Sequence, residues 1–101
     1  MINEFKELKN NNNNIITNKT EIYNNGKYIG EFKNGMRDGK GIYYYNDGER
    51  YEGDWKNDLK QGKGIFYYNN GDREMGDFMN GNQVGKHVTL QKNGKISYNE
   101  Y

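Results

Sequence analysis

Side chains of two kinds alternate along residues 27–33. Tyr28 and Phe32 stand two positions from Gly30 on either side, and isoleucine, glutamate and lysine follow them in turn. A period of two predicts a β-strand with an aromatic face and a mixed face. Residues 40–45 show the same alternation, and the asparagine, aspartate and glycine residues between the two stretches favour turns. The pattern therefore predicts a β-hairpin.

The hairpin pattern recurs every 23 residues. The pentapeptide from Tyr51 to Trp55 has a related counterpart that begins at Tyr28 and another that begins at Glu74. A fixed period of this length indicates stacked repeats rather than a globular chain around one thick core. We expect an all-β fold in which β-hairpins stack into a short solenoid. The predicted units cover residues 28–50, 51–73 and 74–96.

The third unit departs from the pattern of the first two. Glu74 replaces the tyrosine, and His87 replaces the glycine that the other units carry as Gly41 and Gly64. Terminal repeats of a solenoid are commonly atypical because no further neighbour covers them. Partial strands are expected to flank the three units, at residues 21–23 and 95–101.

The first 20 residues are predicted to form a separate tail. Asparagine fills every position from Asn10 to Asn14. Such a tract has little to bury and so does not offset the entropy lost on ordering it. The predicted organisation is a flexible Asn-rich tail over residues 1–20 and a repeat domain over residues 21–101.

Glycines inside the predicted strands need a structural reason, since glycine costs about 0.5–1 kcal/mol relative to alanine there. If a six-residue loop joins Lys33 to Lys40, Phe32 lies opposite Gly41 and the equivalent Trp55 lies opposite Gly64. A ring on bare backbone buries about 150–250 Å² at about 25 cal/mol/Å², which outweighs the penalty. The same register sets Gly30 opposite Tyr43 and Gly53 opposite Phe66. The structural glycines are predicted to be Gly30, Gly41, Gly53, Gly64 and Gly76.

The composition fits a thin assembly held together by rings. The chain has 101 residues, 15% aromatic, with ten tyrosines and a mean hydropathy of −1.32. The net charge is +1 with acids and bases mixed, so nothing draws the chain onto nucleic acid. There is no cysteine, and neither a signal peptide nor a long apolar run is found, so a cytoplasmic location is expected.

Two functional interpretations apply to a column of lysines that follows the repeat. The column could contact the phosphates of an anionic membrane, or it could form solvated strand positions that exchange charge with neighbouring carboxylates. Exposed ladders of this second kind contribute little individually. The possible lipid-contact residues are Lys40, Lys63 and Lys86.

Catalysis and cofactor binding are not predicted. His87 is the single histidine, so a histidine metal cluster or a catalytic triad lacks partners. The triplets at 39–41 and 62–64 are glycine-lysine-glycine, but no helix follows to hold a phosphate. The repeated carboxylates lie on an open face with nothing to perturb them. We therefore expect a non-enzyme with neither metal nor cofactor.

The residues from Tyr51 to Trp55, followed by the triplet 62–64 and Asn70-Gly71, resemble the MORN (membrane occupation and recognition nexus) repeat. The resemblance covers residues 28–96, although Asp58 stands where glycine is usual and two phenylalanines stand where tryptophan is commonest. It implies an elongated, twisted, single-layer antiparallel meander of stacked hairpins. It also implies a scaffold or partner-binding role, often in cytoskeletal or membrane-associated assemblies.

The leading functional hypothesis is a non-catalytic interaction module that presents its sheet surface to a protein partner. The alternatives are peripheral binding to anionic membranes through the lysine column, and self-assembly through edge strands at 98–101 or 21–23. The aromatic residues of the repeats either only pack the hairpins against one another or also form a groove for the partner. These packing or partner-binding residues are Tyr28, Phe32, Tyr43, Tyr51, Trp55, Phe66, Tyr68 and Phe78.

Overall fold

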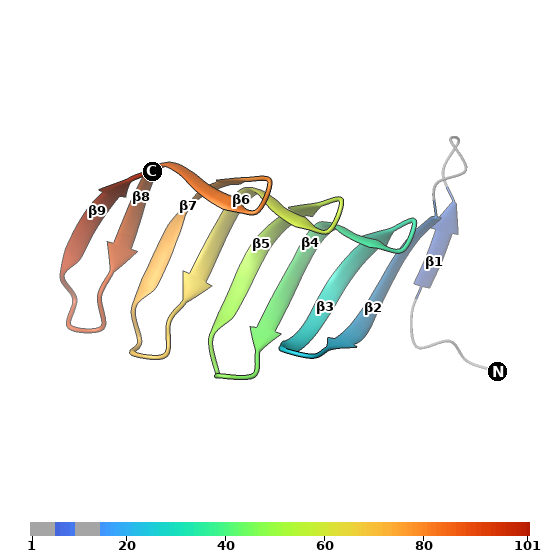
Figure 1. Ribbon diagram of the computed structural model, residues 1–101, viewed down its shortest axis with the longest axis horizontal. Helices are drawn as coiled ribbons and strands as arrows, with labels where there is room; N and C mark the ends of the chain where they lie inside the picture. The colour runs from blue at the N-terminus through green and yellow to red at the C-terminus, as the bar shows by residue number, and fades with distance from the viewer. Residues whose placement is uncertain (1–5, 10–14) are drawn as a thin grey trace.

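The described residues form one antiparallel sheet in which each strand pairs with its neighbours along the chain (Figure 1). A computed structural model describes residues 6–9 and 15–101, and its sheet has nine strands. The strands are β1 (Lys6–Lys9), β2 (Ile15–Tyr23), β3 (Gly26–Lys33), β4 (Met36–Tyr45), β5 (Arg50–Lys56), β6 (Leu59–Tyr67), β7 (Arg73–Met79), β8 (Asn82–Leu90) and β9 (Ile96–Glu100).

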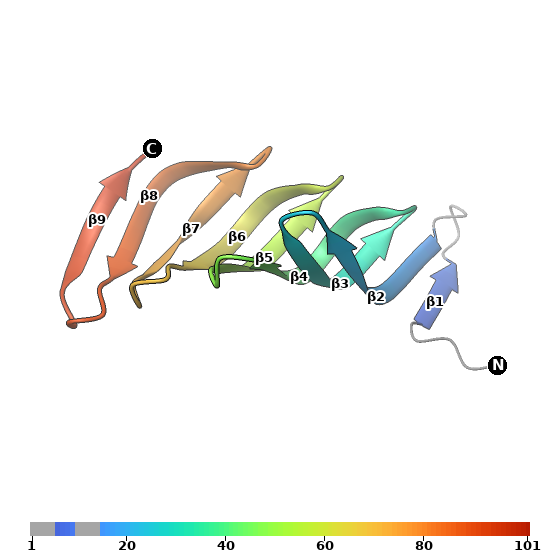
Figure 2. The same ribbon diagram turned by 60° about the horizontal axis from the view of Figure 1, so that its bottom comes forward.

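The sheet is a single elongated layer. It measures 49 × 26 × 21 Å, and the second view shows the strands succeeding one another without a second layer above or below them (Figure 2). The predicted all-β antiparallel meander of stacked hairpins is therefore confirmed. The three predicted units correspond to the hairpins β3–β4, β5–β6 and β7–β8.

Each unit turns through two residues whose φ angles are positive. The first turn has Asn34 at φ 52° and Gly35 at φ 82°, and the second has Asn57 at φ 49° and Asp58 at φ 69°. Two successive positive φ angles are typical of the type I′ turn, which matches the twist of the strands that it joins. Asn-Gly satisfies this geometry without strain, whereas Asp58 adopts it without being glycine.

The predicted loops between the strands were too long. β4 begins at Met36 rather than Lys40, because Gly39 does not lie in a loop but in a bulge within the strand. Its φ of 99° is one that glycine adopts readily. Between Gly30 and Phe32 the pairing shifts register, and β6 repeats the shift opposite β5. Reading this glycine as part of a turn caused the error.

The bulge also corrects the predicted register. Gly30 pairs with Gly41, not with Tyr43, and Phe32 pairs with Arg37. The second unit follows the same rule, since Gly53 pairs with Gly64. Glycine thus lies opposite glycine, which leaves a wide strip of bare backbone. Neither Phe32 nor Trp55 is the residue directly opposite a glycine of its own hairpin.

Tyrosine rings cover this bare strip. A Cβ atom built at Gly41 would overlap the ring of Tyr28, and one built at Gly64 would overlap the ring of Tyr51. The ring lies diagonally across the hairpin from the glycine, rather than opposite to it. Packing of rings on glycine backbone is therefore present, but with tyrosines in place of the predicted phenylalanine and tryptophan.

The N-terminal boundary of the sheet lies earlier than predicted. Residues 15–20 belong to β2 and pair along β3, and β1 pairs with β2 in turn. The predicted tail is therefore wrong over 6–9 and 15–20. β-branched residues at 15–17 favour a strand and find an open neighbour in β3. The asparagine run and residues 1–5 lie outside the described residues.

At the other end, the expected last strand is present as β9. It pairs with β8 from Lys86 opposite Glu100 to Leu90 opposite Ile96. Most of its large side chains stay exposed, including Tyr98 and Ile96. In the part of the chain that the structure describes, β9 is an edge of the sheet.

Candidate functional site

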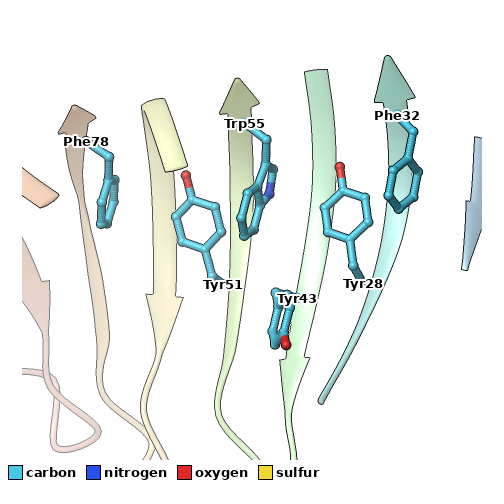
Figure 3. Packing of buried hydrophobic residues seen from close by; sticks show 6 residues of the cluster. All are labelled: Tyr28, Phe32, Tyr43, Tyr51, Trp55 and Phe78. Carbon is cyan, nitrogen blue, oxygen red and sulfur yellow. The ribbon is translucent and has the colours of Figure 1, made fainter. Parts of the chain in front are cut away.

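Six aromatic residues from four strands, β3, β4, β5 and β7, pack into one cluster on a single face of the sheet (Figure 3). Each is at most 6% exposed, although the sheet has only one layer. Tyrosine rings that rise from one end of the strands alternate with rings that descend from the other end (Figure 3). We call this surface the aromatic face. Its buried members are Tyr28, Phe32, Tyr43, Tyr51, Trp55 and Phe78.

The buried rings meet edge to face. The centroid of Tyr28 lies 5.0 Å from that of Phe32 and 5.2 Å from that of Trp55, with the planes 81° and 84° apart. Tyr51 repeats this arrangement at 5.3 Å from Trp55 and 5.1 Å from Phe78. Such perpendicular pairs contribute about 0.5–1.5 kcal/mol each beyond buried area. Trp55 thus joins the first unit to the second.

Both buried tyrosines place the hydroxyl against a backbone carbonyl. Tyr28 donates to the carbonyl oxygen of Glu31 at 2.8 Å, and Tyr51 donates to that of Asp54 at 3.0 Å. Burial raises the pKa of both hydroxyls above its usual value, and the nearby carboxylates of the same two acidic residues raise it further. The neutral phenol is therefore the form that the folded protein holds.

Arg37, on β4, lies over the rings of the aromatic face. Its guanidinium carbon is 4.7 Å from the ring centroid of Trp55, 5.0 Å from that of Tyr23 and 5.5 Å from that of Tyr43. Its Nε also donates to Asp58 Oδ1 at 3.0 Å. The carboxylate comes from the turn of the next unit, so this ion pair links adjacent hairpins.

Lys60, on β6, occupies the equivalent position one repeat later. Its Nζ lies 5.2 Å from the ring centroid of Tyr51, 5.6 Å from that of Tyr45 and 5.8 Å from that of Phe66. It donates to the hydroxyl oxygen of Tyr45 at 3.0 Å. The structure therefore brings two cations onto the aromatic face that the sequence interpretation missed. Arg37 and Lys60 are 23 residues apart, which is one repeat, and this spacing was the sequence signal that could have identified them.

The aromatic face is hollowed beside these cations. One hollow of about 590 Å³ lies between the first two units, and a second of about 270 Å³ lies between the second and third. Lys60 and Gly81 line both. The first is also lined by Tyr23, Asn24, Asn25, Arg37, Tyr43, Tyr45, Trp55, Asp58 and Leu59, and the second by Phe66, Tyr68, Phe78, Asn82 and Gln83.

All eight predicted aromatic residues lie on this face. Six are buried in the cluster, and Phe66 packs against it partly exposed. Tyr68 follows, with its ring centroid 4.8 Å from that of Phe66. Tyr23 and Tyr45 belong to the same surface and were not predicted. They are the last residues of β2 and β4.

The third unit fills the same space from the opposite strand. The His87 ring lies against Gly76, where a Cβ atom would overlap it, and Nε2 is 2.8 Å from the carbonyl oxygen of Asp77. That carbonyl corresponds to the ones that Tyr28 and Tyr51 reach in the earlier units. Since a carbonyl oxygen only accepts, Nε2 carries a proton.

Glu74 completes this buried group. Its Oε2 lies 2.9 Å from Nδ1 of His87, and both side chains are at most 5% exposed. Nδ1 has no other partner among the described residues. Because both Nδ1 and Oε2 can accept, a hydrogen bond between them needs a proton on one of the two atoms. The carboxylate also accepts from Tyr68, Gln83 and Tyr101 at 2.7, 3.0 and 2.8 Å. The two departures of the third unit therefore compensate one another.

The opposite face carries the predicted lysine column. Lys40 pairs with Asp54, and Lys63 pairs with Asp77 at 2.9 Å. This hydrogen bond and the carboxylate charge raise the pKa of Lys63. The Nζ of Lys86 lies 5.8 Å from the ring centroid of Tyr98. Two of the three ammonium groups are thus neutralised within the sheet.

A row of apolar side chains crosses the opposite face beside the lysines. Successive strands contribute Ile29, Ile42, Ile65, Met75 and Val88 in register, with Glu52 inserted in the middle. Ile29 is 40% exposed and Met75 is 39% exposed. This face therefore keeps apolar surface in contact with solvent, in addition to the aromatic face.

Residues 6–9 and 15–101 contain neither a metal-binding cluster nor a membrane-spanning helix. No group of three or more histidine, cysteine, aspartate or glutamate side chains is arranged to hold a metal ion there. Within the same ranges, no helix is long and apolar enough to cross a membrane.

The sequence comparison agrees with the geometry of the first two hairpins. The MORN repeat family matches residues 28–50 and 51–73, which are the units in which tyrosine covers paired glycines. A search of curated proteins finds no match to the chain. The third hairpin continues the sheet outside the matched residues. With two matched repeats forming the centre of a continuous hairpin sheet, the chain belongs to the MORN repeat proteins.

Proposed function

We propose that this chain is a non-catalytic protein-binding module whose aromatic face receives a segment of a partner protein. The hollow of about 590 Å³ between the first two units carries this proposal. Its walls combine tyrosine, tryptophan and arginine, the residue types enriched at the energetic centres of interfaces. Partly exposed rings such as Tyr45 and Phe66 leave aromatic surface for a partner to cover.

The ring arrangement supports this face over the opposite one. Buried rings hold one another edge to face, so the floor of the hollow is rigid before any partner arrives. Preorganised surfaces lose less entropy on binding. The apolar row of the opposite face is interrupted by Glu52, whose carboxylate is paired with Arg50.

Membrane binding through the lysine column receives less support. Lys40 and Lys63 already have carboxylate partners 14 residues away, and a lipid phosphate would have to displace them. Sedimentation with vesicles that contain anionic lipid tests this alternative, because binding by exposed lysines fades steeply with salt. Association of edge strands is the other alternative. Light scattering at several concentrations tests it, and a monomer at all concentrations would exclude it.

Two adjacent tyrosines provide a matched test of the proposal. Tyr45 lines the hollow, whereas Tyr44 projects from the opposite face and is 36% exposed. Affinity capture from an extract of the source organism, read by mass spectrometry, should retain partners with Tyr44→Ala and lose them with Tyr45→Ala. Binding of the purified partner should then follow the same order. The reverse order would place the contact on the opposite face.

The family resemblance supports a cytoplasmic, cytoskeleton-associated setting for this module. Imaging of the fluorescently tagged chain in its own cells tests the setting. A signal that is separate from cytoskeletal markers would contradict the second half of this expectation.

A further inference from the structure

The cation of the second unit lacks the carboxylate that the cation of the first unit has. Arg37 pairs with Asp58, which belongs to the turn of the next hairpin. Lys60 stands one repeat later, and the corresponding turn residue is Gly81, which has no side chain. The backbone bond between the two positions is kept, from the nitrogen of Gly81 to the carbonyl oxygen of Lys60 at 2.9 Å. Only the counter-charge is missing.

Among the hydrogen bonds of residues 15–101, the ammonium group of Lys60 donates to one acceptor, the Tyr45 hydroxyl. An ammonium group carries three protons, so two remain for another acceptor. The stem lies among three rings that hold Nζ at the boundary between the two hollows. A cation in a walled, partly dehydrated position gains more from an anion than one in open solvent does.

We propose that Lys60 anchors the carboxylate of an aspartate or glutamate side chain in the partner segment, flanked by aromatic or aliphatic residues that enter the two hollows. This inference rests on the proposed function and specifies its partner. The carboxylate takes the place that Asp58 fills beside Arg37. The adjoining rings select for apolar neighbours, which an isolated phosphate or a free carboxylic acid would lack.

A peptide library provides the test. Random 12-residue peptides displayed on phage are selected against the full chain, and parallel selections use Lys60→Met, Lys60→Arg and Lys56→Met. Methionine keeps the packing of the lysine stem but removes its charge. Lys56 is exposed on β5 and lines neither hollow, so Lys56→Met controls for the same change in net charge.

The expected result is enrichment of acidic residues beside apolar ones with the unmodified chain, Lys60→Arg and Lys56→Met, and loss of that enrichment with Lys60→Met. For a selected peptide, replacing its acidic residue by the amide should weaken binding about tenfold. The Lys60→Met chain should bind the acidic and amide forms equally, since the pair is then already broken. Melting temperatures and amide spectra show whether each variant is folded.

Other results overturn the inference in distinguishable ways. Peptides that require Tyr45 but show no acidic preference, or keep that preference with Lys60→Met, would remove the role of Lys60 and leave the binding groove intact. Absence of any selected peptide would count against both proposals. Sedimentation of the chain with vesicles of phosphatidylcholine and phosphatidylserine that is lost in Lys60→Met would assign the lysine to lipid instead.

Discussion

The second and third hairpins solve one packing problem with different residues. In the second, Tyr51 crosses from β5 to cover Gly64 on β6; in the third, His87 crosses from β8 to cover Gly76 on β7. Both rings reach the carbonyl oxygen of the aspartate that follows the glycine of the first strand. The repeat therefore requires a ring on bare backbone with a donor for this carbonyl, and either strand of the hairpin can provide it.

The comparison also shows what the exchange requires. A tyrosine has one polar group, the hydroxyl, which donates to the carbonyl oxygen. An imidazole has a second ring nitrogen, which also needs a hydrogen-bond partner. Glu74 occupies the vacated tyrosine position and faces that nitrogen. A buried carboxylate then needs its own donors, and Tyr68, Gln83 and Tyr101 provide them. One changed ring thus recruits side chains from the turn that precedes β7, from β8 and from Tyr101, which follows β9.

The largest effect should come from filling the bare strip. Gly64→Val should destabilise the protein by about 3 kcal/mol, because the branched side chain takes the space of the Tyr51 ring. Urea denaturation measures the loss. Gly35→Asp is the matched control, since Asp58 holds the same turn position natively, and it should cost less than about 1 kcal/mol. Equal losses in the two variants would refute the ring-on-glycine explanation.

Removing the histidine should have the next largest effect. His87→Ala leaves a cavity beside Glu74 and leaves the Asp77 carbonyl without its donor, so a loss of about 2–3 kcal/mol is expected. The double variant Glu74→Tyr with His87→Gly recreates the arrangement of the second hairpin and should recover most of it. Thermal and urea unfolding of Glu74→Tyr, of His87→Gly and of the double variant give the coupling energy between the two positions. Additive losses would mean that the two positions do not compensate one another.

A smaller loss is expected from the hydroxyl alone. Tyr51→Phe keeps the ring but leaves the Asp54 carbonyl without its donor, which should cost about 1 kcal/mol. Tyr44→Phe removes an exposed hydroxyl from the opposite face and should change the free energy of unfolding by almost nothing. A comparable loss in both variants would show that the hydrogen bond is not the cause.

The smallest effect concerns alkaline pH. Burial raises the pKa of Tyr51 in the folded state above its usual value of 10.0. The associated stability is therefore complete below about pH 10, where the unfolded tyrosine stays neutral, and is lost as the pH rises toward the folded pKa. At about pH 10.5, Tyr51→Phe should lose less stability than the unmodified chain, by under about 1 kcal/mol. Denaturation curves at several pH values measure this; parallel losses would contradict it.

Much of the fold could be predicted because the repeat displays the same evidence several times. The alternation around Tyr28 identifies the strands and their faces, and the 23-residue interval identifies the hairpins. The register could not be derived in the same way. Gly39 reads equally well as a turn and as a bulge, and only pairing between strands distinguishes the two. That single ambiguity shifted the predicted partners of Phe32 and Trp55.

The candidate site was predicted in part for a similar reason. Rings that alternate with glycine are visible along one strand, so the eight aromatic residues were found. Arg37 and Lys60 acquire their role only where neighbouring hairpins place rings from three strands around each cation. Likewise, Glu74 and His87 were interpreted only as departures from the repeat pattern. Their contact joins β7 to β8, so it is not visible along either strand.

The sequence by itself determined that this protein is a row of hairpins with an aromatic side, because period-two alternation and a fixed repeat are local properties of the chain. Tertiary structure decided which ring covers which glycine, which carboxylates are neutralised and which cation keeps an open side. These outcomes depend on distances between strands, and a bulge of two extra residues in one strand changes them without altering the pattern of residues.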